Sequence, residues 1–146
     1  MGKTIAAALA VAAVFSLAGW HGRGCGGGAA RDPAAITAAV NERLEDALQS
    51  LDATPAQRTA IQAIKDKLLA DGLKLREGQA AARQALLAEW KSASPDRNKV
   101  HAILDERSAA MTAMAHEAAD AVLQLHDVLT PEQRAKVEGR LQRFHR

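Results

Sequence analysis

Apolar residues recur every three or four positions along most of this chain, a spacing typical of amphipathic helices. The pattern occupies four segments, and each starts at a proline that directly follows a residue able to cap a helix. The segments are 33–50, 55–91, 95–128 and 131–144, and they start at Asp32-Pro33, Thr54-Pro55, Ser94-Pro95 and Thr130-Pro131. The sequence therefore predicts an all-α fold with two long and two short helices.

Within each segment the apolar residues fall on one stripe, which predicts the core. The stripes hold Ile36, Val40, Leu44, Ala47, Leu48 and Leu51; Ile61, Ile64, Leu68, Leu75, Ala82, Leu86 and Trp90; Val100, Ile103, Leu104, Met111, Met114, Ala118, Val122 and Leu125; and Val137, Leu141 and Phe144. The short turn at 92–94 predicts an antiparallel hairpin of the two long helices, each about 50 Å long or more. Gly72 and Gly78 indicate a bend or a close approach of another backbone, and we favour the bend.

Aromatic residues make up only 3% of the chain, so the hairpin has little material for a thick core. A single thin hairpin would leave a long apolar stripe in water. We therefore expect an elongated four-helix hairpin that pairs with a second copy as an antiparallel, curved homodimer. Its concave face would be open to a partner.

Two of the helix starts carry a further signal. Thr54-Pro55-Ala56-Gln57 and Thr130-Pro131-Glu132-Gln133 both place Gln three residues after the capping Thr. The Thr oxygen can accept from the Gln backbone N–H while the Gln side chain accepts from the Thr N–H. Each sequence therefore predicts a capping box.

The segment before the first helix has the composition of an export signal. A short basic start precedes an uncharged run over residues 4–18, which ends in Ser16-Leu17-Ala18. This predicts a signal peptide over residues 1–18, although an uncleaved membrane anchor is the alternative. Residues 19–31 then form a glycine-rich segment that we expect to be flexible, and 32–146 form one helical domain. We expect a periplasmic protein without stable membrane insertion after signal removal.

Charge and cysteine content narrow the functional classes. Removal of residues 1–18 would leave 18 basic and 17 acidic residues, so no global charge favours nucleic acid as a partner. Cys25 is the only cysteine, which rules out an intramolecular disulfide. One local excess remains at Arg134, Lys136, Arg140, Arg143 and Arg146, which suits the dipole of a helix C-terminus or, alternatively, an acidic partner.

No sequence feature indicates an enzyme. The chain lacks tyrosine, a nucleophile elbow, a phosphate-binding loop and a His-Glu-x-x-His motif. Its carboxylates lie three or four residues from Lys or Arg, as in Asp96 with Lys99 and Glu132 with Lys136, which is typical of surface ion pairs.

The sequence offers one weak set of metal ligands. On a helical wheel His101, His116 and His126 do not converge, so we expect them to be structural or solvent-facing. His21 and Cys25 lie four residues apart and could hold Zn or Cu if His145 or another subunit completed the shell. We expect no required cofactor.

An exported helical chain with Thr54-Pro55-Ala56-Gln57 and Leu129-Thr130-Pro131-Glu132-Gln133 resembles the Spy/CpxP family of periplasmic stress proteins, whose signature is a repeated Leu-Thr-x-x-Gln. The family also includes metal-responsive ZraP and CnrX-like members. The second motif matches in full, whereas Ala53 stands where the first would have Leu. The resemblance covers roughly residues 32–145.

The resemblance implies a cradle-shaped dimer that shields unfolded envelope proteins without ATP. It equally allows a metal sensor or an adaptor that binds a sensor protein. The residues favour the chaperone, because the second segment mixes cations with more apolar residues than one stripe requires. The candidate client-binding residues are Lys65, Leu69, Leu73, Lys74, Arg76, Arg83 and Leu87. The alternative is a solvated charged face beside a dimer seam.

Overall fold

The computed structural model describes residues 32–144, and this part of the chain contains four helices and no strand. The helices are α2 (Pro33–Ser50), α3 (Pro55–Lys91), α4 (Arg97–Val128) and α5 (Pro131–Phe144). The predicted all-α fold and four-helix order are therefore confirmed. The predicted signal peptide and glycine-rich segment, together with His21, Cys25 and His145, lie outside the described residues.

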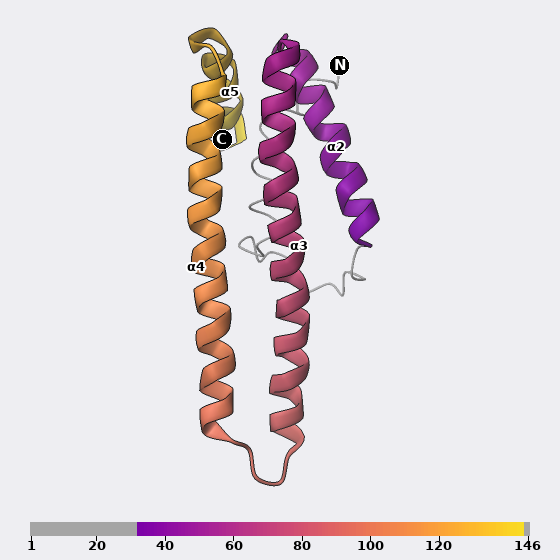
Figure 1. Cartoon of the computed structure of the whole chain (residues 1–146), viewed down its shortest axis with the longest axis vertical. Helices are drawn as coiled ribbons and strands as arrows, with labels where there is room; N and C mark the ends of the chain where they lie inside the picture. The colour runs from indigo at the N-terminus through magenta and orange to yellow at the C-terminus, as the bar shows by residue number, and fades with distance from the viewer. Residues whose placement is uncertain (1–31, 145–146) are drawn as a thin grey trace.

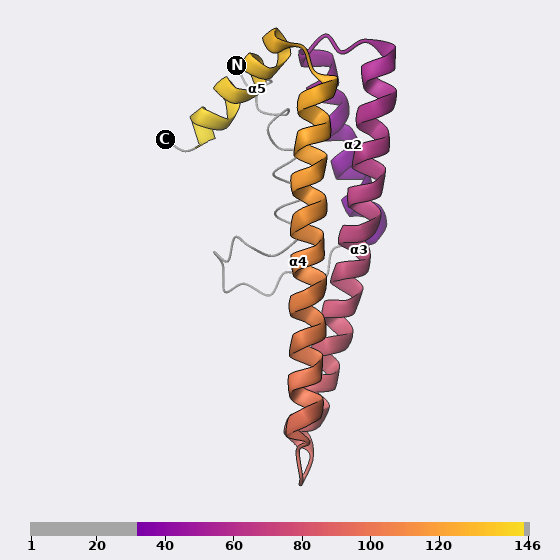
Figure 2. The same cartoon turned by 60° about the vertical axis from the view of Figure 1, so that its left-hand side comes forward.

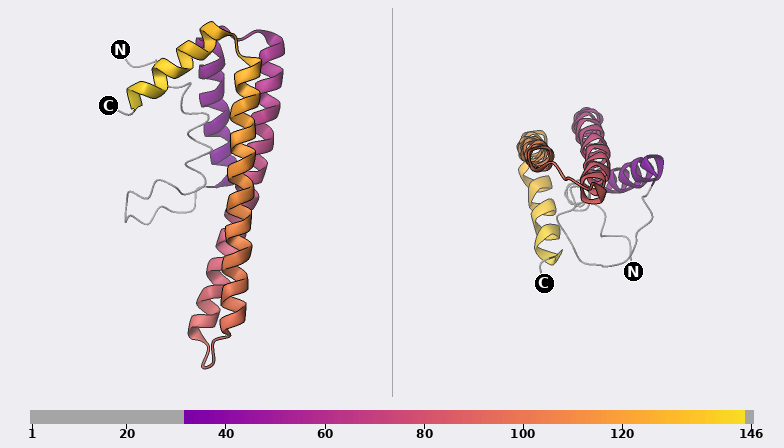
Figure 3. Two further views of the ribbon diagram at one scale, coloured as in Figure 1. Left: turned by 90° about the vertical axis from the view of Figure 1, so that its left-hand side faces the viewer. Right: turned by 90° about the horizontal axis from the view of Figure 1, so that it is seen from below.

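Helices α3 and α4 form a long antiparallel hairpin (Figure 1). Their connection lies at one end of the molecule, and α2 packs along the other half of α3. Helix α5 turns back from the end of α4 and leaves it at an angle (Figure 2). Seen along the hairpin, α2 and α5 extend in different directions (Figure 3). None of the four described helices is long and apolar enough to cross a membrane.

The core consists of small clusters rather than one thick centre. The largest cluster joins α2, α3 and the two short connections at the end remote from the hairpin tip, and its buried members are Leu44, Leu48, Leu51, Ala53, Ile61 and Leu129. A second cluster lies between α3 and α4 at mid-length. A third joins Ile36 and Val40 of α2 to Leu69 of α3. All six apolar residues predicted for the first stripe are buried, which confirms that stripe.

The stripes of the other helices are only partly buried. Trp90 is 83% exposed, and Leu104, Met111, Val122 and Leu141 are between 37% and 49% exposed. A single chain therefore leaves part of these stripes in water, as expected for a thin hairpin. For Trp90, Leu104 and Met111 the reason is that each long helix has a single helical neighbour toward the hairpin tip, and one neighbour cannot cover a stripe this wide.

The connection at the hairpin tip also differs from the prediction. Helix α4 begins at Arg97 instead of Pro95, and its N-cap is Asp96 instead of Ser94. The Asp96 carboxylate accepts from the backbone N–H of Asn98 at 2.9 Å and of Lys99 at 3.3 Å, so two free donors of the first turn are bonded. Pro95 therefore lies just before the cap.

Glu89 of α3 joins the two helices at the hairpin tip. Its side chain is 11% exposed, and its carboxylate accepts from the Lys99 ammonium at 2.5 Å and from the Asp96 backbone N–H at 3.0 Å. The hydrogen bond from Lys99, followed by that from the Asp96 N–H, lowers the pKa of Glu89. Lys99 therefore pairs with Glu89 across the tip, and only its backbone N–H bonds to the predicted partner, Asp96.

We expect this carboxylate to make stability depend on pH. Because its pKa is lower in the folded state, the Glu89 contribution is present above the unfolded pKa of about 4.3 and is lost as pH falls through the folded pKa. Glu89→Gln should unfold at a lower denaturant concentration than the parent at pH 7, and the gap should narrow below about pH 4. Urea titrations at several pH values measure this, and an equal gap at all pH values would contradict the assignment.

The turn between α2 and α3 contains the single non-glycine residue with positive φ in the described part of the chain, Asp52 at φ 53°. The Asp52 N–H donates to the Gln49 carbonyl at 3.1 Å, and the Ala53 N–H donates to the Leu48 carbonyl at 3.0 Å, which is the Schellman arrangement. Leu48 and Ala53 also share the largest core cluster.

We expect Asp52→Gly to raise the free energy of unfolding by about 0.5 kcal/mol or more, because glycine adopts positive φ without the cost that other residues have. The gain should exceed the loss of the exposed 3.2 Å pair of Asp52 with Lys136, since such pairs contribute little. Chemical denaturation measures the change, and Asp52→Ala is the control, which should be less stable than the glycine variant.

Of the two glycines inside α3, Gly78 lies under a side chain of the partner helix. A Cβ at Gly78 would meet the guanidinium of Arg107, which reaches across from α4 and donates to the Leu75 carbonyl at 3.0 Å. A Cβ at Gly72 would meet nothing within 4 Å. Gly78 therefore allows the close approach of a side chain, whereas the sequence favoured a bend and offered the close approach of a backbone as the alternative.

Candidate functional site

The two Thr-Pro-x-Gln sequences both form complete capping boxes. The Gln57 N–H donates to Thr54 Oγ1 at 3.3 Å, while the Thr54 N–H donates to Gln57 Oε1 at 3.0 Å. Thr130 and Gln133 repeat the same two bonds at 3.3 and 3.0 Å. Pro55 and Pro131 occupy the first helical positions, as their fixed φ favours.

The structure also brings the two boxes together. The Gln57 and Gln133 amides donate to each other's Oε1 atoms, at 2.8 Å from Gln57 Nε2 and 3.2 Å from Gln133 Nε2. Each Nε2 also donates to a carbonyl of the other connection, Gln57 to Val128 at 2.9 Å and Gln133 to Leu51 at 3.0 Å. Gln133 is only 8% exposed. The paired amides therefore hold the start of α3 against the start of α5.

Three cations of α5 form contacts with other parts of the described fold, namely Arg134, Lys136 and Arg140. Arg134 Nη1 donates to the carbonyls of His126 and Leu129, at 2.9 and 3.0 Å, so it bonds the C-terminal end of α4. Lys136 pairs with Asp52 at 3.2 Å rather than with Glu132, and Arg140 donates to Ser50 Oγ at 2.9 Å. These cations therefore join α5 to its neighbours, and Arg134 also complements the dipole at the C-terminus of α4.

One face of the hairpin carries ion pairs. Lys67 of α3 bonds Asp71 at 3.1 Å and Glu117 of α4 at 3.2 Å, and Lys74 approaches Asp71 at 3.7 Å. The hydrogen bond from Lys67 lowers the pKa of Asp71, and the bond to Asp71 raises the pKa of Lys67. We call this side the ionic face. Its cations and carboxylates neutralise each other.

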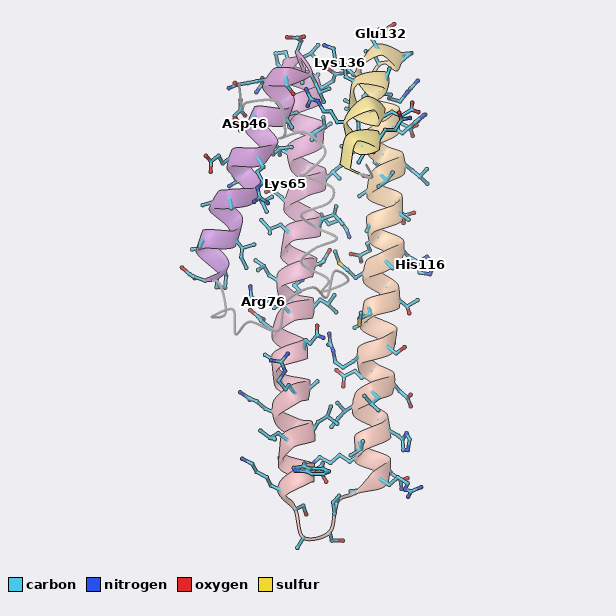
Figure 4. The ribbon with its side chains drawn as sticks, turned by 180° about the vertical axis from the view of Figure 1, so that it is seen from behind. Asp46, Lys65, Arg76, His116, Glu132 and Lys136 are labelled. Carbon is cyan, nitrogen blue, oxygen red and sulfur yellow. The ribbon has the colours of Figure 1, made fainter. Side chains whose placement is uncertain are left out.

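The opposite side of the hairpin has a different chemistry. We call the line along which α3 and α4 pack the seam. On the helical wheels of both helices Lys67 and Glu117 lie to one side of the seam, so residues about 40–140° to its other side share the opposite face. This is the side on which Lys65 of α3 donates to Asn41 of α2, and in Figure 4 both Lys65 and Arg76 extend from α3 on the side of α2. We call it the open face. Its exposed or half-buried members between α2 and the hairpin tip are Arg76, Arg83 and Leu87 of α3 and Leu104 and Met111 of α4. Val122 of α4 is on the same side but lies level with α2.

No Asp or Glu occupies the open face on α3 below Leu73 or along α4 within the described residues. The carboxylates nearest in sequence, such as Glu77, Asp105 and Glu106, fall on the outer side or on the ionic face by the same wheel. Arg76 and Arg83 provide positive charge there, while His101 and His126 lie exposed at its edge on α4. The open face therefore combines apolar side chains with cations alone.

The predicted client-binding residues are divided by the fold. Leu69 is 5% exposed and packs under α2, where Leu73 is partly buried against it, so neither belongs to the exposed surface. The Lys65 side chain is 13% exposed and bonds Asn41 at 2.7 Å and Asp66 at 2.5 Å. The exposed Lys74 lies on the side of the ionic face. The predicted residues that remain on the open face are Arg76, Arg83 and Leu87.

Sequence reasoning missed the contribution of α4 to this surface. Leu104, Met111 and Val122 were assigned to the core because they recur at the spacing of the buried stripe. Two features of the sequence could have indicated this exposed surface. The stripe is wider than one neighbouring helix covers, and no carboxylate lies beside it.

The histidines of α4 lie on the surface. His101, His116 and His126 are exposed, and Figure 4 shows His116 pointing away from the hairpin. Among residues 32–144 no three His, Cys, Asp or Glu side chains come close enough together to hold a metal ion. The predicted ligands His21, Cys25 and His145 fall outside the residues that the structure describes.

Comparison with known proteins gives a family for the chain. A family model described as LTXXQ motif family protein matches residues 39–141, which include both capping boxes. No curated protein and no solved structure matches the chain significantly. The matched region covers more than half of the 146 residues. The chain therefore belongs to the LTXXQ motif family, which includes the Spy/CpxP-like periplasmic proteins.

Proposed function

We propose that this protein is a periplasmic chaperone that shields unfolded envelope proteins without ATP or a metal, and that the open face receives them. Family membership supports a periplasmic protein linked to stress or metals. The observation that favours the chaperone is the open face itself, where exposed Leu104 and Met111 lie at the level of Arg76 and Arg83. We also propose that the protein is not an enzyme.

The physical argument rests on what such a face can bind. Exposed apolar side chains gain from covering apolar segments of an unfolded chain, at roughly 25 cal/mol per Å² buried. Cations without neighbouring carboxylates attract acidic segments from a distance and speed encounter. Neither effect depends on a particular amino-acid sequence in the client, so the surface suits many unfolded clients rather than one folded partner.

A second copy of the chain completes this proposal. Exposed Leu123 on the outer side of α4 and Leu141 of α5 leave apolar surface that a homodimer would partly cover, and an antiparallel pair would join two open faces into one longer surface. The homodimer stays a prediction, which sedimentation velocity measures. A monomer at micromolar concentration would contradict it.

Suppression of aggregation tests the function. Residues 19–146, which retain every described residue, are mixed with two unrelated denatured proteins, without ATP, before and after treatment with chelator. The proposal expects less light scattering from both proteins near a stoichiometric ratio, unaffected by chelator. Absence of suppression, or suppression only with metal present, would instead favour a metal-linked sensor or an adaptor for one sensor protein.

A further inference from the structure

We propose that the tip of the hairpin docks on the surface of an anionic phospholipid bilayer through Trp90, Leu87, Lys91 and Arg97. This goes beyond the proposed function and does not depend on it. The tip is the end of α3, the connection 92–96 and the start of α4. It lies at the far end of the molecule from α2 and α5, so a flat surface can reach it without meeting either helix (Figure 1).

The tip presents apolar side chains that the fold leaves uncovered. Trp90 is 83% exposed and Leu87 is 50% exposed. A tryptophan has an apolar body and one polar N–H, and such side chains favour the boundary between headgroups and hydrocarbon. The connection beyond them, Ser92-Ala93-Ser94-Pro95, carries no charge and no bulky side chain that would hold the indole away from a surface.

The tip carries a net positive charge, because Lys91, Arg97 and Lys99 outnumber its two carboxylates, and both carboxylates are bonded within the fold. Glu89 accepts from Lys99 at 2.5 Å and from the Asp96 N–H at 3.0 Å. Asp96 accepts from two backbone N–H groups of the first turn of α4. Lys91 and Arg97 are exposed and form no salt bridge with any described residue. Two cations flanking an exposed indole complement an anionic headgroup layer.

Other occupants fit the tip less well. A second tip would bring like charges from Lys91 and Arg97 together, which opposes pairing of tips. An unfolded polypeptide would also contact Leu104 and Met111, which lie farther along the open face toward α2. The tip alone offers the compact combination of one indole and two cations at an unobstructed end, which suits a planar anionic surface.

Tryptophan fluorescence with vesicles tests this inference. In residues 19–146 carrying Trp20→Phe, Trp90 is the only tryptophan, so its emission reports the tip. With vesicles of equal phosphatidylglycerol and phosphatidylcholine we expect the emission to shift to shorter wavelength. The shift should disappear at high salt and with pure phosphatidylcholine.

Variants then separate the tip from general electrostatic attraction. Lys91→Gln with Arg97→Gln should weaken partition into the anionic vesicles by about 25-fold, about fivefold for each cation. Arg43→Gln with Lys74→Gln removes the same charge from exposed sites away from the tip and should preserve the shift. The inference is overturned by an absent shift, by an equal shift with neutral vesicles, by equal effects of the two charge pairs, or by a shift with denatured protein but none with vesicles.

Discussion

Gln133→Ala should lower the free energy of unfolding by about 2 to 4 kcal/mol, because it leaves buried polar groups without partners. The Leu51 carbonyl loses its 3.0 Å bond, the Thr130 N–H loses its cap, and the Gln57 amide loses the bonds it shares with Gln133. Urea denaturation followed by circular dichroism measures the change. Gln142→Ala is the matched control, since Gln142 bonds only Glu138 on the surface of the same helix, and it should change stability by about 0.5 kcal/mol or less.

The pairing of the two amides makes a sharper prediction. Gln57→Ala should also lower the free energy of unfolding. The loss in the double variant should be smaller than the sum of the two single losses by about 1 kcal/mol or more, because each single change already removes the bonds between the amides. Additive losses would show that the boxes act separately. A variant too unstable to fold would be replaced by Gln133→Glu, which retains the length of the side chain but removes its two donors.

Charge reversal on the open face should abolish most of the aggregation suppression. With Arg76→Glu and Arg83→Glu, the surface would repel acidic clients, and the concentration of protein for half-suppression should rise about tenfold or more. Leu104→Gln with Met111→Gln should also weaken suppression, because the apolar contact is lost while the helix is retained. Light scattering with two unrelated denatured proteins measures both effects.

Each pair of changes has a matched control elsewhere on the chain. Arg43→Glu with Lys74→Glu changes the net charge equally, and the two exposed side chains lie on α2 and on the side of the ionic face, respectively. Leu123→Gln removes an apolar side chain that is 63% exposed on the outer side of α4. Equal loss of suppression in a control and its partner would show that net charge or total apolar surface, rather than the open face, binds clients.

The sequence predicted those parts of the fold that depend on neighbouring residues. The capping boxes at Thr54 and Thr130 and the start of three helices follow from side chains within a single turn. The start of α4 was misplaced by two residues because Ser94 and Asp96 are both good caps. The choice depends on Glu89, which bonds the Asp96 N–H from seven residues away.

The candidate site depends on pairings between distant segments, which one sequence does not contain. Gln57 and Gln133 lie 76 positions apart, so each box was predicted while the bond between them was not. The same reason explains why Leu69 was expected on the surface: its burial requires knowing where α2 packs. Conversely, the width of the α4 stripe was visible in the sequence. Which part of this stripe α3 covers depends on how α4 is rotated about its own axis relative to α3, and the sequence alone does not give that rotation.

The most direct test of the account is to locate a bound client on the hairpin. In a Cys25→Ser background, Leu104→Cys and Glu106→Cys each carry an environment-sensitive dye, and denatured protein is added. The two sites are two residues apart on α4 but lie on the open face and away from it, respectively. The account predicts a shift of dye emission to shorter wavelength at position 104 and little change at position 106. Equal responses at both positions, or none at 104 while aggregation is suppressed, would contradict it.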